Sequence, residues 1–221
     1  MHLESSFISK FKFLKNKTVL IPNCIPFDKE KIKKISFEKK IKNNQEVYTF
    51  LSIGRLVKYK GYEYSIRALS KLDFNFNYFI IGSGPLKIKL EELIKNLKLE
   101  KKVKLLGEIS DIEKNKLLSI SDIFLFPSIT QSEAYGLVQL EAMSYGLPII
   151  NTNLKNGVNY LAPPNVAITC KIKSINEIIK AIKDLTNNKL FYKKKSDVVL
   201  SNLKRFNIDE MRSKFKKIIL E

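Results

Sequence analysis

From Tyr48 onward, short runs of hydrophobic residues alternate with longer segments in which hydrophobic residues recur three or four positions apart. The short runs predict strands, and the longer segments predict helices. Strands and helices that alternate along a chain are typical of a parallel sheet, so the sequence predicts an α/β fold. Strands are expected at 48–53, 76–81, 103–106, 123–126, 148–151 and 166–170, and helices at 62–71, 86–97, 111–119, 136–145 and 175–186.

The two ends of the chain lack this alternation. Residues 1–46 hold one short hydrophobic run, at 18–21, followed by a lysine-rich stretch with two prolines that is typical of a linker. Residues 189–221 are highly charged and are expected to be helical. We therefore expect an α/β domain over 47–188, preceded by a linker segment and followed by a helical extension. A narrow hydrophobic stripe in that extension is formed by Phe206, Met211, Phe215 and Ile219.

Length and composition limit the class of protein. The chain has 221 residues, of which 44% are hydrophobic and 28% charged. This composition excludes a disordered tail, a collagen-like repeat and a disulfide scaffold. Because a domain typically has roughly 100 to 200 residues, one domain and part of a second can be accommodated, and two full α/β domains cannot.

The net charge of +18 comes almost entirely from lysines that are spread along the whole chain. Such a distribution favours a solvated, lysine-rich surface over a dedicated binding face. The second interpretation is attraction to an anionic membrane or to phosphorylated ligands. Nucleic acid ranks third, because no zinc-finger spacing or RNA-binding signature is present, and we expect no nucleic-acid partner.

Cysteine usage and hydropathy indicate the compartment. Cys24 and Cys170 are too few for a disulfide framework, which favours a reducing cytosol. No hydrophobic run approaches the roughly 18 residues that a membrane-spanning helix needs, and charges interrupt the N-terminal segment that a signal peptide would occupy. We expect a cytoplasmic protein, at most peripheral at the inner face of the cytoplasmic membrane.

The loop after the first expected strand carries two cations, Arg55 and Lys60, in the segment GRLVKYKG that begins at Gly54. Ligands of open parallel sheets bind beyond the carboxyl ends of the strands, where this loop lies. A planar guanidinium and a flexible ammonium suit two phosphate groups at unequal distances, so a diphosphate is the expected ligand. The alternative is a pair of solvated loop cations.

The second expected strand runs into the segment GSGP at 82–85, which suggests a dinucleotide site only weakly. The third glycine of the fingerprint would fall at Lys87, and the motif does not open the domain. Glu108 could serve as the ribose-binding acid of such a site. A tight turn that lets a ligand approach the backbone is the favoured interpretation.

The segment at 127–150 carries the strongest signal, with Glu133 and Glu141 on either side of an expected helix start at Gly136. A helix start presents free backbone N–H groups and the positive end of the dipole, which favour anions. Glu141 lies on a helix rich in hydrophobic residues, where a carboxylate needs hydrogen-bond donors such as sugar hydroxyls. The alternatives are a surface position for Glu141 and helix capping for Glu133.

Together these segments resemble the C-terminal, nucleotide-sugar-binding domain of the family-four retaining glycosyltransferases of the GT-B fold. The resemblance implies one half of that fold, a Rossmann-like parallel sheet of about six strands with helices on both faces. It also implies sugar transfer from a nucleotide-diphosphate sugar with retention of configuration. The segments that carry it are IPN at 21–23, GRLVKYKG at 54–61, IIGSGPLKIKLEELI at 80–94, VKLLGEISD at 103–111, PSITQSEAYGLVQLEAMSYGLPII at 127–150 and RFNIDEM at 205–211.

The resemblance also implies roles for individual residues. Arg55 and Lys60 would hold the donor diphosphate, and Glu133 would meet the donor sugar near the reacting carbon. Glu141 would bind the ribose hydroxyls. We take Arg55, Lys60 and Glu133 as the catalytic candidates. The turn that follows Gly107, with Glu108 and Ile109, would border the base. The backbone of Tyr135, Gly136, Leu137 and Val138 would surround the phosphate and the sugar, and Gly54 is the remaining donor-binding candidate.

These roles require no metal and no cofactor, because cations and a helix start would stabilise the charge that grows on the leaving diphosphate. The chain has no Asp-x-Asp motif, and its single histidine, His2, cannot form a metal site alone. The family resemblance also implies that an N-terminal acceptor domain is largely missing, with residues 1–46 as its remnant and linker. A separate acceptor-domain subunit is therefore an expected partner.

The function favoured by the sequence is a hexosyl-type glycosyltransferase of bacterial surface polysaccharide or lipopolysaccharide synthesis. A lipid-linked acceptor and the lysine-rich surface would both bring it to an anionic membrane. The alternative is a truncated protein that binds nucleotide sugar without transferring it. An NAD-dependent oxidoreductase and a nucleic-acid binder rank well below both.

Overall fold

Six parallel strands form one sheet in the order β3-β2-β1-β4-β5-β6 in the computed structural model, which describes residues 22–24 and 47–220. All neighbouring strands pair in parallel. The chain therefore builds outward from β1 in one direction and then from β4 in the other. The strands are β1 (Tyr48–Ile53), β2 (Phe76–Ile81), β3 (Val103–Gly107), β4 (Ile123–Phe126), β5 (Ile149–Thr152) and β6 (Ile168–Cys170).

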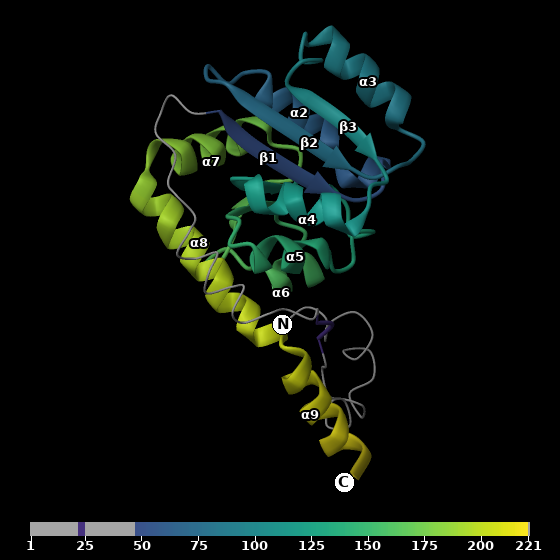
Figure 1. The fold of residues 1–221 in the computed structure, drawn as a ribbon, viewed down its shortest axis with the longest axis vertical. Coiled ribbons are helices and arrows are strands. Elements are labelled where there is room, and N and C mark those ends of the chain that lie inside the picture. Colours follow the sequence, from purple (N-terminus) through teal and green to yellow (C-terminus); the bar gives the residue numbers. More distant parts are fainter. Residues whose placement is uncertain (1–21, 25–46, 221) are drawn as a thin grey trace.

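Helices cover both faces of this sheet (Figure 1). Side chains of α2, α3, α7 and the start of α8 pack on one face, and side chains of α4, α5, α6 and the rest of α8 pack on the other. The expected α/β fold with helices on both faces is thus confirmed. The helices are η3 (Lys58–Lys60), α2 (Tyr62–Leu69), α3 (Lys87–Asn96), α4 (Asp111–Ile120), α5 (Val138–Ser144), α6 (Gly157–Leu161), α7 (Ile175–Asn187), α8 (Lys189–Leu203), η4 (Lys204–Phe206) and α9 (Ile208–Leu220).

Alternation along the strands explains why the sheet is buried on both sides. Successive side chains of a strand point to opposite faces. Phe50 accordingly packs with α2 and α7, whereas Leu51 packs with α5. Phe124 and Leu125 of β4 divide in the same way, and all four side chains are buried. A strand buried on both faces needs hydrophobic residues at consecutive positions, which is the run that the sequence shows.

The expected strands and helices from Tyr48 onward are present with bounds within two residues of the expectation, and three differences stand out. The strand β6 begins at Ile168, because the N–H groups of Val166 and Ala167 bond to the carbonyl of Pro163 in a turn. Helix α5 begins at Val138 instead of Gly136. The five-residue helix α6 was not expected at all. The expected strand at 18–21 and most of the segment 1–46 lie outside the described residues.

The C-terminal part of the chain divides into an anchored and a projecting section. Helix α8 is anchored by Ser196, which donates to the carbonyl of Gly146, and by Asn202, which donates to the carbonyl of Leu161, both at 2.7 Å. Helix α9 projects away from the sheet (Figure 1). The expected hydrophobic stripe is divided accordingly: Phe206 is buried, Met211 lies against the partly exposed Cys24, and Phe215 and Ile219 are 48% and 75% exposed.

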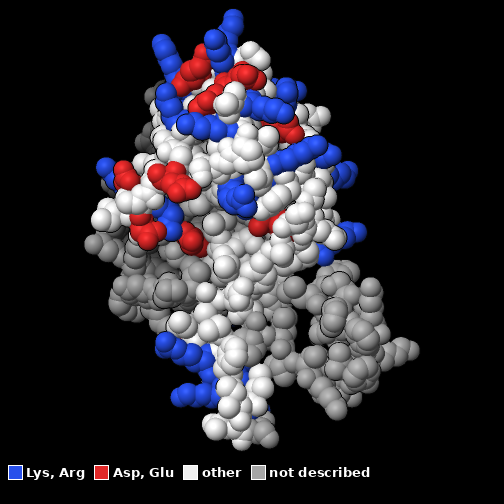
Figure 2. Space-filling model, turned by 90° about the vertical axis from the view of Figure 1, so that its right-hand side faces the viewer, with Lys and Arg blue, Asp and Glu red and all other residues white. Residues whose placement is uncertain are grey.

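The charged residues do not form one basic patch on the face that Figure 2 shows. Lys and Arg side chains lie among Asp and Glu over the upper part of the molecule in that view. Ion pairs also form along helices, such as that of Lys180 with Asp184. Within the described part of the chain, no helix is both long enough and apolar enough to cross a membrane.

Candidate functional site

The candidate residues gather where β1 and β4 lie side by side. From these neighbouring strands the chain continues in opposite directions along the strand order, since β2 lies next to β1 and β5 lies next to β4. The loops beyond their carboxyl ends therefore diverge, and such a switch point is where open α/β sheets bind ligands. Arg55 and Lys60 follow β1, and Glu133 follows β4.

The loop after β1 is folded so that Lys60 faces the loop after β4. Residues Lys58–Lys60 form the short helix η3, which ends at Gly61 with a φ of 67°. A Cβ atom at Gly61 would lie 2.2 Å from the carbonyl oxygen of Pro127, so only glycine allows this approach. The N–H of Ile129 bonds to the carbonyl of Tyr59 at 2.7 Å. The two loops are thus fixed against each other through their backbones.

Lys60 and Glu133 form a buried ion pair across this contact. Lys60 Nζ lies 2.5 Å from Glu133 Oε2, and the two side chains are only 11% and 9% exposed. Ser128 Oγ donates to the same carboxylate oxygen at 3.1 Å, and Lys60 Nζ lies 5.1 Å from the ring centroid of Phe126. Each buried charge therefore has a partner, as its removal from water requires.

Tyr62 and Gly54 complete the surroundings of the Lys60 ammonium. The Tyr62 hydroxyl donates to the carbonyl of Gly54 at 3.0 Å. A Cβ atom at Gly54 would lie 3.0 Å from Lys60 Nζ, so the missing side chain makes room for the lysine. Burial, reinforced by the neighbouring Tyr78 and Glu133, holds the pKa of Tyr62 well above its ordinary value. Tyr62 is accordingly a protonated hydrogen-bond donor at this site.

Arg55 differs from Lys60 in its environment. Its side chain is exposed, and among the described residues it has no ion-pair partner. The structure thus brings Lys60 and Glu133 together and leaves Arg55 in the same loop as a cation that is available to a ligand.

The glycines of the loop after β2 allow that loop to pack closely against the loop after β1. A Cβ atom at Gly82 would lie 2.2 Å from the Gly54 carbonyl oxygen, and one at Gly84 would lie 2.6 Å from the Leu56 carbonyl oxygen. On the Cβ side, the backbone that approaches these glycines belongs to the loop after β1. The expected approach of a ligand to this turn stays a prediction. Their value to the site is indirect, because they fix the loop that carries Arg55.

Glu108 lies at the edge of this region, after β3. Its side chain is exposed and accepts a hydrogen bond from Ser83 Oγ at 2.5 Å. Ile109 packs partly into the core. No atom of the described residues lies within 4 Å of the position of a Cβ atom at Gly107, so this part of the structure leaves the space beside the turn open.

The segment between the two glutamates begins its helix later than expected. Gly136 has a φ of 77°, in the left-handed region, and therefore lies before α5. Among the described residues, the N–H groups of Gly136, Leu137 and Val138 donate to no other backbone group. These three backbone N–H groups are thus free of backbone partners within the described part of the chain, as expected. They belong to a turn with a left-handed glycine, however, and not to the first turn of a helix.

The side chain of Tyr135 does not take part in this cluster. Its ring lies 6.5 Å from that of Tyr160, and its hydroxyl donates to the carbonyl of Asn23 at 3.5 Å. Burial, together with the nearby Tyr160, raises the pKa of Tyr135 to about 12. Only the backbone of Tyr135 is therefore placed beside the candidate donors.

Glu141 is partly buried and faces a lysine from another helix. Lys114 Nζ of α4 lies 3.1 Å from Glu141 Oε2, and 3.0 Å from Asp111 Oδ1 on its own helix. Partial burial acts to lower the pKa of Lys114, but the two carboxylates outweigh it, and the net shift is upward. Glu141 is thus neither fully buried nor a freely solvated surface residue.

Three residues in this region were missed by sequence reasoning: Ser128, Asn156 and Lys114. Asn156 Nδ2 donates to the carbonyl of Glu133 at 2.7 Å and so holds the backbone of the glutamate. The polar residues that follow β4 and β5 could have suggested Ser128 and Asn156, because both loops reach the same edge of the sheet. No sequence signal singles out Lys114 among so many lysines.

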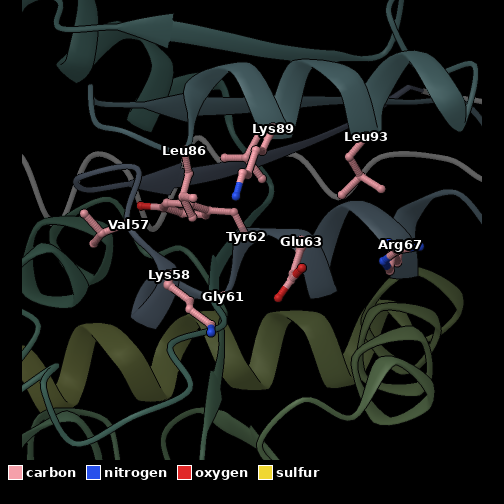
Figure 3. A pocket seen from close by; sticks show the side chains of 10 residues that line it. Val57, Lys58, Gly61, Tyr62, Glu63, Arg67, Leu86, Lys89 and Leu93 are labelled. Atoms are coloured by element: carbon pink, nitrogen blue, oxygen red, sulfur yellow. The ribbon is translucent and has the colours of Figure 1, made fainter.

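A separate groove of about 300 Å³ lies between α2 and α3. Figure 3 shows Lys89 extending toward Tyr62 and Lys58 at the margin. None of the candidate residues Arg55, Lys60 and Glu133 lines it. The groove is thus a different feature from the contact between the loops after β1 and β4.

Metal chemistry has no evident centre in this region. Within residues 22–24 and 47–220, no three His, Cys, Asp or Glu side chains come close enough to one another to hold an ion. The charged groups available to a ligand are the side chains described above.

Comparison with protein families and curated proteins gives consistent matches. The family described as Glycosyl transferases group 1 matches residues 33–204. An uncharacterized glycosyltransferase of Methanocaldococcus jannaschii is 37% identical over 171 residues, which are 74% of this chain and 41% of that protein. An uncharacterized glycosyltransferase of Haemophilus influenzae is 31% identical over 175 residues, 77% of this chain and 48% of that protein. The chain thus spans less than half the length of both relatives.

Solved structures share the fold. The apo form of the lipopolysaccharide outer core galactosyltransferase WaaB gives a TM-score of 0.74 at 19% identity, covering 91% of this chain and 55% of that one. HepE of Anabaena in complex with UDP gives 0.71 at 21% identity, covering 87% and 53%.

A third solved structure contains a single domain. The C-terminal domain of a glycosyl transferase group 1 family protein, LpcC of Francisella tularensis, gives a TM-score of 0.65 at 22% identity, and the match covers 82% of this chain and 96% of that one. The sheet order, the matched family and the coverage agree that this is the Rossmann-like, C-terminal half of a GT-B fold, and the chain belongs to the group 1 glycosyltransferases.

Proposed function

We propose that this chain binds a nucleotide-diphosphate sugar at the β1–β4 switch point and acts as the donor half of a retaining glycosyltransferase. The observation that carries the proposal is the buried pair of Lys60 and Glu133, which joins the loops after β1 and β4. Arg55, in the same loop as Lys60, is exposed and has no ion-pair partner among the described residues. A buried ion pair at a ligand-binding edge, next to a free cation, suits a ligand that has both phosphates and hydroxyl groups.

Each candidate residue has a distinct part in this proposal. Arg55 and Lys60 neutralise the diphosphate, and the N–H groups of Gly136 to Val138 donate to its oxygens. Glu133 accepts hydrogen bonds from the donor sugar, and Glu141 accepts them from the ribose. The turn from Gly107 to Ile109, with Glu108, borders the base, where the open space beside Gly107 leaves room for a ring.

The chemistry follows from where charge develops. When the bond between the sugar carbon and the phosphate oxygen breaks, the electron pair goes to the oxygen of the leaving diphosphate. Fixed cations and backbone N–H groups that face this oxygen stabilise the charge without any reorganisation. The acceptor hydroxyl oxygen then forms the new bond to the sugar carbon, and its proton passes to the departing diphosphate oxygen. Retention of configuration is the outcome that the family resemblance implies.

The acceptor site is proposed to lie on another domain or subunit. The chain covers 41% and 48% of the relatives described above, and about half of WaaB and HepE. We take 47–188 as the donor domain, 1–46 as a linker with a remnant of the other domain, and 189–221 as a helical extension.

A role in bacterial surface polysaccharide or lipopolysaccharide synthesis is the finer proposal. It is supported by the fold shared with WaaB, a lipopolysaccharide outer core galactosyltransferase, and by the lysine-rich composition, which would favour peripheral contact with an anionic membrane from the cytoplasmic side.

Nucleotide binding is tested by thermal unfolding of the chain with and without UDP and GDP. A ligand at a hundred times its dissociation constant stabilises the folded state by roughly 2.7 kcal/mol, which corresponds to about 5 to 10 °C for a chain of this size. Glu141→Ala should remove most of the shift. Arg55→Ala should weaken UDP or GDP more than the corresponding nucleoside, because only the diphosphate meets the cation.

Arg67→Ala is the matched control, since Arg67 is also exposed, lies on α2 and has no ion-pair partner among the described residues. It should leave the shift unchanged. Equal shifts for the unaltered protein and Glu141→Ala would contradict the site.

The alternative function is binding of a nucleotide sugar without transfer, which the same donor site would also support. Release of nucleoside diphosphate from a donor that the protein binds, in the presence of acceptor glycans, separates the two. Binding without any release would support the alternative.

A further inference from the structure

Lys114 makes the one ion-pair contact to Glu141 that is seen within the described residues, from a helix that the family motifs do not include. We propose that Lys114 is a positioning residue, which holds the Glu141 carboxylate for the ribose hydroxyls and so sets the preference for ribonucleotides over 2′-deoxyribonucleotides. This inference rests on the proposed nucleotide-binding function and extends it to selectivity.

The geometry divides the two oxygens of Glu141 between two tasks. Oε2 is buried and has no hydrogen-bond partner among the described residues, and its contact with Lys114 Nζ at 3.1 Å is electrostatic. The whole side chain is nevertheless 28% exposed. The accessible surface of the Glu141 side chain therefore lies outside Oε2. No hydrogen bond or ion pair to Oε1 is seen within the described residues, and that oxygen is assigned to the ligand.

The position of Lys114 is itself fixed by the start of α4. Ser110 and Glu113 form a capping box, in which Ser110 Oγ accepts from the N–H of Glu113 and Glu113 accepts from the N–H of Ser110. The N–H of Lys114 bonds to the carbonyl of Ser110 at 2.9 Å. This register points the lysine at α5, which lies beside α4 in Figure 1. Asp111 binds the same ammonium and limits its movement further.

The chemistry of the two groups explains the expected selectivity. An ionised carboxylate only accepts hydrogen bonds, and ribose hydroxyls donate them. A lysine beside it supplies a countercharge and fixes the orientation of the carboxylate as it leaves water. Without the lysine, the buried oxygen lacks its partner, and the group gains by turning toward solvent. Hydroxyl recognition is then weakened, while the contacts to phosphate are unaffected.

A role of the Lys114–Glu141 pair in folding alone can be distinguished from a role in selectivity by what its loss changes. Both side chains are about a quarter exposed, and pairs of this kind contribute little to folding. Loss of Lys114 should therefore leave the melting temperature of the unliganded protein nearly unchanged. A role in selectivity instead appears as a change in the ratio of two dissociation constants.

The experiment compares UDP with 2′-deoxy-UDP, and GDP with 2′-deoxy-GDP, by calorimetric titration of the full chain. Lys114→Met should reduce the preference for the ribonucleotide about tenfold, because the carboxylate is no longer held for its hydrogen bond from the ribose 2′-hydroxyl. Glu141→Gln should reduce it similarly, and the double variant should show no further loss. Lys114→Arg, which retains the charge, should keep most of the preference. This variant still tests the proposal if Lys114→Met does not fold.

Lys116→Met is the matched control, because Lys116 is an exposed lysine of the same helix without an ion-pair partner among the described residues. It should leave the ratio unchanged. If Glu141→Gln loses the preference and Lys114→Met keeps it, the role of Lys114 is wrong and the proposed function stands. If the unaltered protein binds neither UDP nor GDP, the proposed function fails and this inference fails with it.

Discussion

The buried pair of Lys60 and Glu133 combines a stabilising and a functional requirement in two side chains. Both groups are about nine-tenths buried, so each depends on the other for compensation of its lost hydration. Ser128 and the ring of Phe126 supply the remaining contacts. A ligand that separates the pair must therefore give each residue a new partner. A phosphate can take the place of Glu133 beside Lys60, and a sugar hydroxyl can take the place of Lys60 beside Glu133.

Replacing Lys60 alone should destabilise the protein strongly. Lys60→Met leaves the Glu133 carboxylate buried without its countercharge, and the expected loss in the free energy of unfolding is about 3 to 5 kcal/mol. The combined change Lys60→Met with Glu133→Gln removes both charges and should recover much of this loss. Urea denaturation followed by circular dichroism measures both values.

Lys58→Met is the comparison for this prediction. Lys58 belongs to the same short helix, is exposed and has no ion-pair partner among the described residues. Its replacement should change the free energy of unfolding by no more than about 0.5 kcal/mol. Equal stabilities for Lys58→Met and Lys60→Met would show that the buried pair does not contribute.

At the level of single residues, sequence reasoning succeeded where a residue follows a strand. The carboxyl ends of parallel strands share one edge, so Arg55, Lys60 and Glu133 could be expected near each other. The contact of Lys114 with Glu141 could not, because it depends on how α4 and α5 pack. The roles of these residues in binding stay predictions.

At the level of elements, the loops after β4 and β5 are fixed to each other. Asn156 holds the carbonyl of Glu133, and Thr152 donates to the carbonyl of Ser128. A Cβ atom at Gly157 would lie 2.3 Å from the carbonyl oxygen of Ala134, so α6 packs directly on the backbone that carries Glu133. The position of the glutamate thus depends on a helix that begins 24 residues later in the chain.

Gly157→Ala should therefore affect the site through the backbone. The added methyl group must displace the Ala134 carbonyl, which costs about 1 to 3 kcal/mol as overpacking. The displaced loop should also reduce the thermal shift that UDP or GDP produces. Differential scanning fluorimetry with and without nucleotide gives both quantities.

Asn153→Ala provides the control for that change. Asn153 lies in the same connection, and its exposed side chain has no hydrogen bond within the described part of the chain. It should alter neither the stability nor the shift. A Gly157→Ala protein that responds to nucleotide as fully as Asn153→Ala would disprove the coupling of the two loops.

The elements themselves were predictable to different degrees. Three strands were placed with correct bounds, because consecutive hydrophobic residues between turn residues leave little choice. The short helix α6 was missed, because five residues cannot show helical periodicity. The start of α5 was misplaced, because a left-handed Gly136 is not distinguishable by composition from the first residue of a helix.

At the level of the whole molecule, one face of the sheet is rich in buried groups that carry protons. Tyr62, Tyr78, Tyr192 and Cys170 all belong to the core beneath α2 and α7. Burial is the main cause that raises the pKa of each, to about 12 for Cys170. The folded protein keeps these protons at a pH at which the unfolded chain releases them.

Alkaline pH should therefore lower the free energy of unfolding, because only the unfolded chain releases these protons readily. Each raised pKa contributes stability that is complete below the ordinary values, 9.0 for cysteine and 10.0 for tyrosine, and that is lost as the pH rises through the raised value. The free energy of unfolding should accordingly begin to fall near pH 9, and Cys170→Ala should make its initial fall less steep. Urea titrations from pH 8 to pH 11, with tyrosinate absorbance recorded in parallel, test this. The buried tyrosines should ionise only together with the loss of the circular dichroism signal, whereas ionisation of all nine tyrosines of the chain in a still folded protein would contradict it.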